Sequence, residues 1–311
     1  DVVVLARELN LHQVKDIYET IQRDGIKGPS GELVRIEMFA HGALCMAISG
    51  KCYLSLQTYG ASANRGACYQ LCRRGYEVTD LETGTQLNID NKYIMSPKDL
   101  CTIEFMDKII DAGVKVFKIE GRARSAEYVK RCAQCYRQAA DAVCDGTYTP
   151  ELVASLKEEL SEVFNRGFWD GYYQGARLGE WSTVYGSQAT RKKVYCGKVT
   201  NWFDRIGVAE IAVESAPLRL GAKCMATGST TGVIEFTVND LRVALKPAEE
   251  ATKGTRCSVA IVPENKGVRD GDVEVNADMA RADADAAKVN ADGKIPVRLR
   301  RGDKVYIWEE A

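Results

Sequence analysis

The first half of the chain alternates short apolar runs with longer amphipathic segments. The apolar runs are rich in β-branched side chains, and this composition predicts buried strands. Buried strands are predicted at residues 2–6, 33–40, 91–95 and 114–121.

Helix signals separate these runs. Asn10 can cap a helix that Gly25 ends, and Ser96 followed by Pro97 predicts a helix that continues to Gly113. Further helices are predicted from Ser125 to about Asp145 and from Thr149-Pro150 onward. Strand–helix repetition of this kind predicts parallel strands joined by crossover helices.

The pattern changes at about residue 190, where strand and turn signals replace helices. We therefore predict an α/β domain over residues 1–185 and a small all-β barrel over 186–311. Residues 266–296 are acidic and rich in Ala and Asp, which predicts a mobile insertion before the last strand. The first strand begins abruptly, as if residues before it were missing.

Charge and hydropathy exclude few classes of protein. The 311 residues carry 42 basic and 43 acidic side chains, for a net charge of −1. Composition therefore gives no evidence for nucleic-acid binding, although one local basic face would suffice for it. The sequence has no apolar run of about 18 residues, so no membrane span is expected. It also shows no export signal, which predicts a cytoplasmic protein.

Cysteine is the informative residue type, with 11 cysteines against 2 histidines. An odd number without an export signal disfavours a disulfide framework. Four cysteines lie close together in sequence, and a fifth follows: Cys45, Cys52, Cys68, Cys72 and then Cys101. Glycines between them permit tight turns whose N–H groups can stabilise metal-bound thiolates.

Three interpretations of these cysteines remain open. Structural zinc sites use close pairs of ligands, and only Cys68 and Cys72 have that spacing. The wider intervals favour an iron–sulfur cluster over zinc, and ordinary buried or free thiols are the third alternative. Cys132 and Cys135 form a CxxC within a predicted helix, where a core position is favoured over a metal or redox role.

Polar side chains concentrate near the ends of two predicted strands, where barrel active sites lie. Glu37 and His41 share one strand face, and Lys118 and Glu120 share another. These four residues are candidate catalytic groups, although a buried Lys–Glu pair and a core histidine are the alternatives. Candidate ligands for carboxylate or phosphate groups are Arg65, Arg122 and Arg124.

Several of these segments together resemble one family. The runs EMFAHGALCMAISGKCYLS (37–55), SANRGACYQLCRRGY (62–76), SPKDLC (96–101), KIEGRARSAEYV (118–129) and FNRGFWDGYY (164–173) resemble peptidase family U32, the collagenase-like proteases, in order. The resemblance covers roughly residues 1–180. It implies the C-terminal portion of a TIM-like (β/α) barrel, with the first strands missing.

The resemblance also implies chemistry. Members with assigned functions resemble oxygen-independent hydroxylases, and one branch hydroxylates the tRNA wobble uridine with prephenate. These members carry a [4Fe–4S] cluster, whose ligands would fall on Cys45, Cys52, Cys68 and Cys101, with Cys72 as the alternative. The β-rich tail favours the tRNA branch, so tRNA and prephenate are the expected partners.

Two other functions remain open. A peptidase could use Cys45 with His41 four residues away. A non-catalytic RNA-binding module could use the tail alone. Candidate phosphate contacts in the tail are Arg191, Lys192, Lys193, Arg298, Arg300 and Arg301.

Overall fold

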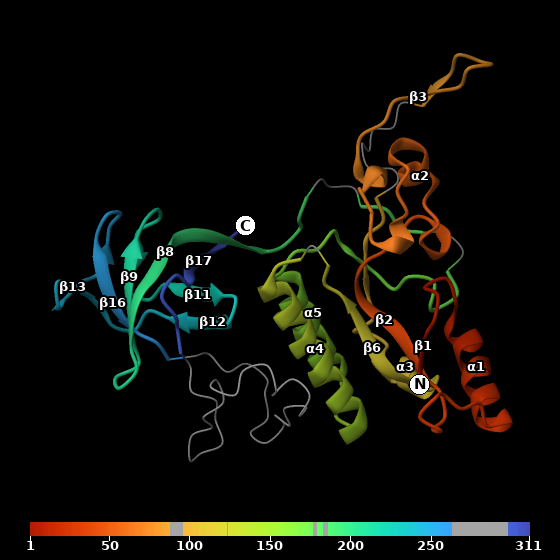
Figure 1. Cartoon of the computed structure of the whole chain (residues 1–311), viewed down its shortest axis with the longest axis horizontal. Helices are drawn as coiled ribbons and strands as arrows, with labels where there is room; N and C mark the ends of the chain where they lie inside the picture. The colour runs from red at the N-terminus through yellow and green to blue at the C-terminus, as the bar shows by residue number, and fades with distance from the viewer. Residues whose placement is uncertain (88–95, 123, 177–178, 183–185, 263–297) are drawn as a thin grey trace. The chain divides into compact units, whose positions relative to one another are not determined.

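The computed structural model describes residues 1–87, 96–122, 124–176, 179–182, 186–262 and 298–311 (Figure 1). The chain divides into two compact units, Asp1–Ala189 and Thr190–Ala311. The strand predicted at 91–95 and the acidic insertion predicted at 266–296 lie outside the described residues.

The first unit is built on an open mixed sheet centred on β2 (Arg35–Ala43). Strand β6 (Val114–Glu120) runs parallel along one side of β2. On its other side, β1 (Val2–Val4) pairs with the start of β2 in parallel, and β5 (Asp99–Cys101) pairs with its end in antiparallel orientation. Strand β7 (Phe168–Trp169) extends the sheet beyond β5. The predicted α/β class is confirmed, but no closed barrel is found among the described residues.

Three of the predicted helices form where local signals place them. Helix α1 (Leu11–Asp24) starts at a capping box, in which Asn10 and Gln13 satisfy each other's backbone N–H groups, and ends at left-handed Gly25. Helix α4 (Ala126–Asp145) follows Ser125, and α5 (Pro150–Ser161) begins with a Thr149 cap and Pro150 in the first turn. The buried face of α4 packs with β2 in the core of this unit.

The helix predicted from Pro97 to Gly113 is wrong over its first half. Residues 99–101 form β5 instead, and a short helix, α3 (Met106–Asp111), follows. Two contacts distant in sequence account for this: Cys101 pairs with His41 of β2, and Asp99 pairs with Phe168 of β7. Sheet pairing thus overrides the local helix signal, and it makes part of the sheet antiparallel.

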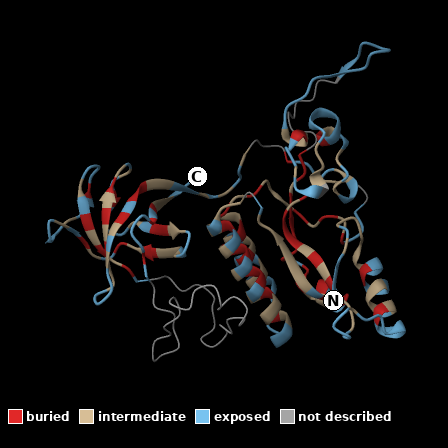
Figure 2. Cartoon of the chain, in the orientation of Figure 1, coloured by how far each residue is buried: buried red, intermediate tan, exposed pale blue. Residues whose placement is uncertain are grey.

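We call residues 45–76 the cysteine segment. It contains α2 (Tyr53–Tyr59) and three short 3₁₀ turns, η1 (Ile48–Gly50), η2 (Ala63–Arg65) and η3 (Leu71–Arg73). A small hairpin of β3 (Val78–Thr79) and β4 (Gln86–Leu87) follows. Figure 1 shows the segment beyond the carboxyl end of β2, and Figure 2 shows that little of it is buried.

The second unit is an antiparallel β domain with its own core. Its eight-stranded sheet has the order β12 (Gly232–Thr237), β11 (Lys223–Gly228), β17 (Lys304–Glu310), β8 (Arg191–Phe203), β9 (Val208–Val213), β16 (Arg256–Ala260), β13 (Leu241–Val243) and β14 (Lys246–Pro247). A separate pair is formed by β10 (Leu218–Arg219) and β15 (Glu250–Ala251). The predicted closure of this sheet into a barrel is not confirmed.

Within the described residues, none of the helices combines the length and apolar character that crossing a membrane requires.

Candidate functional site

A cavity of about 400 Å³ lies where the cysteine segment meets the carboxyl ends of β2 and β6. Ala43 comes from the end of β2, and Glu120 comes from the end of β6. The lining residues are Arg7, Ala43, Leu44, Cys45, Gly50, Ala63, Gly66, Cys68, Gln70, Cys72, Arg73, Glu120, Arg122, Arg124 and Arg166. Three thiols and five guanidinium groups therefore share one cavity.

The thiols of the cysteine segment lie close enough to influence one another's titration. Burial raises the pKa of Cys45 and of Cys72, and the other thiols of the segment raise both further. Cys52 differs: partial burial raises its pKa, but hydrogen bonds from Ser55 and Leu54 outweigh this, so the net pKa is lowered. Its sulfur accepts the Ser55 backbone N–H at 3.4 Å, the kind of donor that stabilises a thiolate.

Cys101 is placed differently from the other predicted ligands. It is only 3% exposed, and its sulfur accepts a hydrogen bond from Tyr136 Oη at 3.7 Å. Burial raises the pKa of this thiol to about 11. Cys101 does not line the cavity, whereas Cys72, the predicted alternative, does.

The thiols are not in a metal-binding arrangement. Within the described part of the chain, no group of three His, Cys, Asp or Glu side chains is arranged closely enough to hold a metal ion. The donor set of Cys45, Cys52, Cys68 and Cys72 is nevertheless all sulfur, which suits iron–sulfur clusters.

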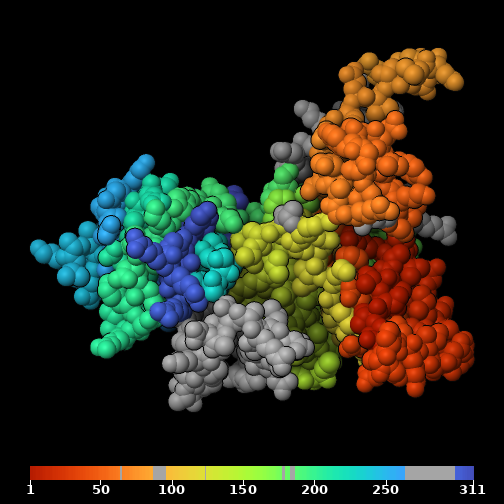
Figure 3. Space-filling model, viewed as in Figure 1, coloured from red at the N-terminus to blue at the C-terminus, as the bar shows by residue number. Residues whose placement is uncertain are grey.

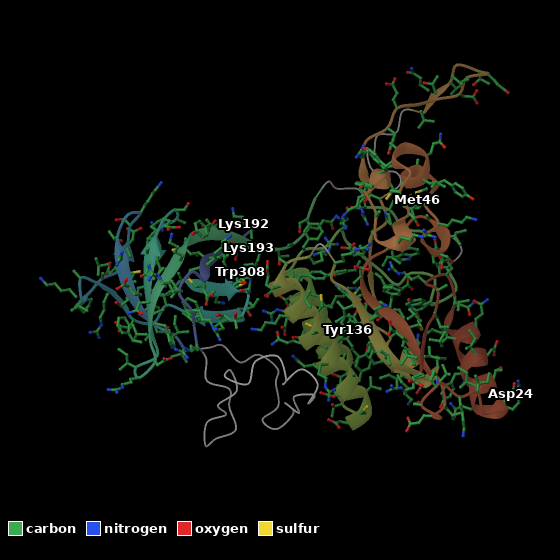
Figure 4. All side chains as sticks on the ribbon, viewed as in Figure 1. Asp24, Met46, Tyr136, Lys192, Lys193 and Trp308 are labelled. Atoms are coloured by element: carbon green, nitrogen blue, oxygen red, sulfur yellow. The ribbon has the colours of Figure 1, made fainter. Side chains whose placement is uncertain are left out.

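His41 lies in the core, away from the cavity. It is 1% exposed, and its Nδ1 atom lies 3.3 Å from the hydroxyl of Tyr136, a residue of α4 that Figure 4 labels. Burial and, to a smaller extent, the charge of Arg124 lower its pKa to about 3, so the ring stays neutral. The β2–β6 register shifts between Phe39 and His41, which breaks the alternation from which a shared face with Glu37 was predicted. The structure thus corresponds to the alternative interpretation, a core histidine.

The other candidate catalytic residues separate into two places. Lys118 pairs with Glu37 at 2.8 Å, and neither lines the cavity. Glu120, which shares a strand with Lys118, does line it and accepts the backbone N–H of Arg122 at 3.0 Å. Arg7 lies 3.8 Å from the same carboxylate. The Lys–Glu pair therefore exists, but between β2 and β6 rather than within β6.

Of the predicted anion ligands, Arg122 and Arg124 line the cavity, whereas Arg65 is exposed and does not. Sequence reasoning missed Arg7, Arg73 and Arg166. Arg73 lies within the SANRGACYQLCRRGY run that the family resemblance rests on, so it could have been found there.

A buried carboxylate holds two of these arginines. Asp99 is 1% exposed, and it accepts hydrogen bonds from Arg124 at 3.2 Å and from Arg166 at 3.3 Å. Arg124 also stacks on Phe164, with 4.0 Å between its guanidinium and the ring centroid. Burial and the charges of Arg73 and Arg124 lower the pKa of Arg166 to about 10, although Asp99 acts in the opposite direction. Positive charge therefore accumulates at the cavity.

Comparison with known proteins gives relatives with two kinds of name. The chain is 60% identical over 261 residues to a protein named collagenase from Porphyromonas gingivalis, an alignment covering 84% of this chain and 63% of that protein. It is 38% identical over 184 residues to the 23S rRNA 5-hydroxycytidine C2501 synthase of Escherichia coli (57% of this chain, 26% of that protein). It is 32% identical over 207 residues to tRNA hydroxylation protein P1 of Bacillus subtilis (65% and 46%).

The chain thus spans less than two thirds of the length of these relatives. The sequence model of peptidase family U32 matches residues 1–183, which is the whole first unit up to its last few residues. This chain belongs to peptidase family U32.

Proposed function

We propose that this protein is part of an RNA hydroxylase that works without molecular oxygen and holds a [4Fe–4S] cluster with the thiols of the cysteine segment. The observation that carries the proposal is the shared cavity, in which three thiols face five arginines. Two relatives named for RNA hydroxylation support the reaction class. The specific substrate that we propose is the tRNA wobble uridine, with prephenate as co-substrate.

The ligands that we propose are Cys45, Cys52, Cys68 and Cys72. Cys72 is preferred to Cys101 because it lines the cavity together with Cys45 and Cys68. Cys52 is outside the lining, but its thiol lies close enough to those of Cys45 and Cys72 to raise their pKa values. The thiols would have to approach one another to bind a cluster, and left-handed glycines at Gly50, Gly60 and Gly66 give the segment its turns. A bound cluster would supply electron-transfer chemistry beside the cavity.

The arginines suit an anionic co-substrate such as prephenate. Arg124 and Arg166 are fixed by Asp99, and Arg122 lies at the exposed side of the cavity. Guanidinium groups bind carboxylates through paired hydrogen bonds, so these side chains could orient both carboxylates.

A peptidase is the second candidate, because a relative at 60% identity is named collagenase. The site gives this candidate little support. The predicted nucleophile–base pair was Cys45 with His41, but His41 is buried against Tyr136 and is absent from the cavity lining. Burial also raises the pKa of Cys45, which disfavours its thiolate.

The deciding experiment measures iron and acid-labile sulfide per chain in the full-length protein purified without oxygen. About four of each are expected. Cys72→Ser should lose them, whereas the matched variant Cys101→Ser should keep them. The reverse result would assign Cys101 as the fourth ligand.

The same preparation is then incubated with unmodified tRNA and prephenate, and the nucleosides are analysed by mass spectrometry for the gain of one oxygen atom. Gelatin is the substrate for the rival activity. Gelatin cleavage by iron-free protein, together with no change in the tRNA, would overturn the proposal.

A further inference from the structure

The cysteine segment is strongly basic in a chain that is otherwise balanced. Residues 45–76 contain no Asp or Glu, although the whole chain has 43 of them. The basic residues of the segment are Lys51, Arg65, Arg73 and Arg74. This local excess is hidden in the net charge of −1, and it marks a surface that attracts polyanions.

The segment also exposes aromatic rings. Tyr53, Tyr59 and Tyr69 are 65%, 50% and 55% exposed. The rings of Tyr59 and Tyr69 lie together, with 4.8 Å between centroids. Figure 3 shows the segment, in orange, at the surface of the first unit, and the exposed fractions of the three rings leave them open to large ligands.

Cations accompany two of the exposed rings. Arg74 Nη2 donates to the hydroxyl of Tyr59 at 3.3 Å, and its guanidinium lies 5.9 Å from the ring centroid. Lys51 Nζ lies 5.6 Å from the ring centroid of Tyr53. Flat rings beside positive charges are what proteins use to bind single-stranded nucleic acids, since bases stack on the rings and phosphates face the cations.

The same segment forms a wall of the cavity. Gly50, Ala63 and Gly66 line the cavity, and the exposed Tyr69 stands between Cys68 and Gln70, which line it too. A strand bound across the tyrosines would therefore pass beside the cavity, where a base turned out of it could meet the thiols and arginines.

We propose that the cysteine segment is the surface on which unpaired RNA binds, with bases stacked on Tyr53, Tyr59 and Tyr69. Lys51, Arg65 and Arg74 then face the phosphates. This inference rests on the proposed function and assigns RNA contact to the cysteine segment, whereas the candidate phosphate contacts named from the sequence lie in the tail.

Unpaired RNA fits this surface better than the other partners do. A protein partner would not offer the regularly spaced negative charges that the basic residues of the segment could pair with. In double-stranded RNA the bases are stacked inside the helix, so their faces are not available to the tyrosines. A single strand offers both free base faces and regularly spaced phosphates.

The test uses the full-length protein purified without oxygen, and a fluorescent oligouridylate of about 12 nucleotides. Binding is followed by fluorescence anisotropy at low salt. The double variant Tyr59→Ala/Tyr69→Ala should bind about 10-fold more weakly or worse. The matched variant Tyr59→Phe/Tyr69→Phe keeps both rings and should bind like the wild type. Ile206→Ala, an exposed apolar residue of the second unit, should change nothing.

Salt dependence tests the charges separately. Each of Lys51→Ala and Arg74→Ala should reduce the slope of log affinity against log salt by roughly 0.7 for each phosphate that the removed side chain neutralises in the wild type. A duplex of the same length should bind more weakly than the single strand. Near-ultraviolet circular dichroism, which does not depend on bound iron, shows whether a variant still folds.

Three results would overturn the inference: unchanged binding in the Ala pair, equal loss in the Phe pair, or preference for the duplex. Release of a co-purifying protein by the Ala pair, with RNA binding intact, would identify a protein surface instead. The proposed function alone would be contradicted if the protein bound RNA through these rings but lacked iron and did not hydroxylate tRNA. This inference alone would be contradicted if the enzyme held iron and hydroxylated tRNA but bound RNA equally well without the two rings.

Discussion

Asp99 shows how one buried carboxylate can organise a site. It accepts from both Arg124 and Arg166, and both of these arginines line the cavity. We expect Asp99→Asn to lower the free energy of unfolding by about 3 kcal/mol, because two partly buried cations lose their buried counter-charge. Urea unfolding at pH 7 measures this.

The control for that variant is Asp24→Asn, which removes an exposed carboxylate that Arg23 holds at 2.8 Å (Asp24 is labelled in Figure 4). It should leave the unfolding midpoint unchanged, since water replaces the pairing of exposed ions. Equal losses in the two variants would show that Asp99 does not hold the arginines.

The low pKa of His41 predicts that the stability of the fold depends on pH. Its pKa in the folded protein is about 3, well below the ordinary 6.5, because it is buried and near Arg124. Between these values the unfolded chain binds a proton that the folded chain does not, so stability is complete above pH 6.5 and falls as the pH drops toward 3. The slope is at most about 1.4 kcal/mol per pH unit.

The measurement compares urea unfolding at pH 7 and pH 5 for the wild type and for His41→Phe. The wild type should lose more stability between the two pH values than the variant, although the variant is less stable at pH 7. A ring signal of His41 that titrates between pH 5 and 8 in an NMR experiment would contradict the assignment. His12→Gln serves to tell the two histidine signals apart.

At the scale of elements, α4 carries three cysteines in contrasting positions. Cys132 and Cys135 face the core, whereas Cys144 lies exposed near the end of the helix. Burial raises the pKa of Cys135 to about 12 and that of Cys132 further still. The CxxC is thus a packing feature of the helix.

We therefore expect iodoacetamide to modify Cys144 in the native apoprotein while sparing Cys132 and Cys135. Cys52 should react early too, because its pKa is lowered. Mass spectrometry after brief labelling measures each site, and labelling in urea shows that all are reactive once unfolded. Early modification of Cys132 would mean that the helix opens or packs differently.

Elements with local signals were predictable, and those decided by distant partners were not. Asn10, Gly25 and Thr149 mark helix ends within a few residues, so α1 and α5 follow from sequence. Strand β5 has three residues, and its conformation depends on β2 and β7. No window of sequence around Asp99 contains that information.

The candidate site likewise contains some features that local sequence predicts and others that depend on distant contacts. Cys45, Cys68 and Cys72 are neighbours in sequence, so their grouping was predictable. Arg166 meets Asp99 across 67 residues, and no local pattern predicts that contact. The placement of His41 depends on a register shift in β2–β6, which residue types alone do not specify.

At the scale of the molecule, each unit has a separate hydrophobic core. We expect a fragment of residues 190–311 to fold by itself and to unfold cooperatively on heating, followed by near-ultraviolet circular dichroism. Phe236→Ala, in the core, should lower the free energy of unfolding by about 3–5 kcal/mol, whereas the exposed Leu245→Ala should not. A fragment without a cooperative transition would mean that this core depends on the first unit.

Strand β17 (Lys304–Glu310) lies between β11 and β8, in the interior of the eight-stranded sheet, although it is the last strand in sequence. During synthesis, every other strand of this sheet leaves the ribosome before the strand that joins its two parts. The β domain therefore cannot complete its sheet until residues up to Glu310 have emerged. A nascent chain stalled before Lys304 would expose the facing edges of β11 and β8, and unpaired strand edges of this kind promote aggregation.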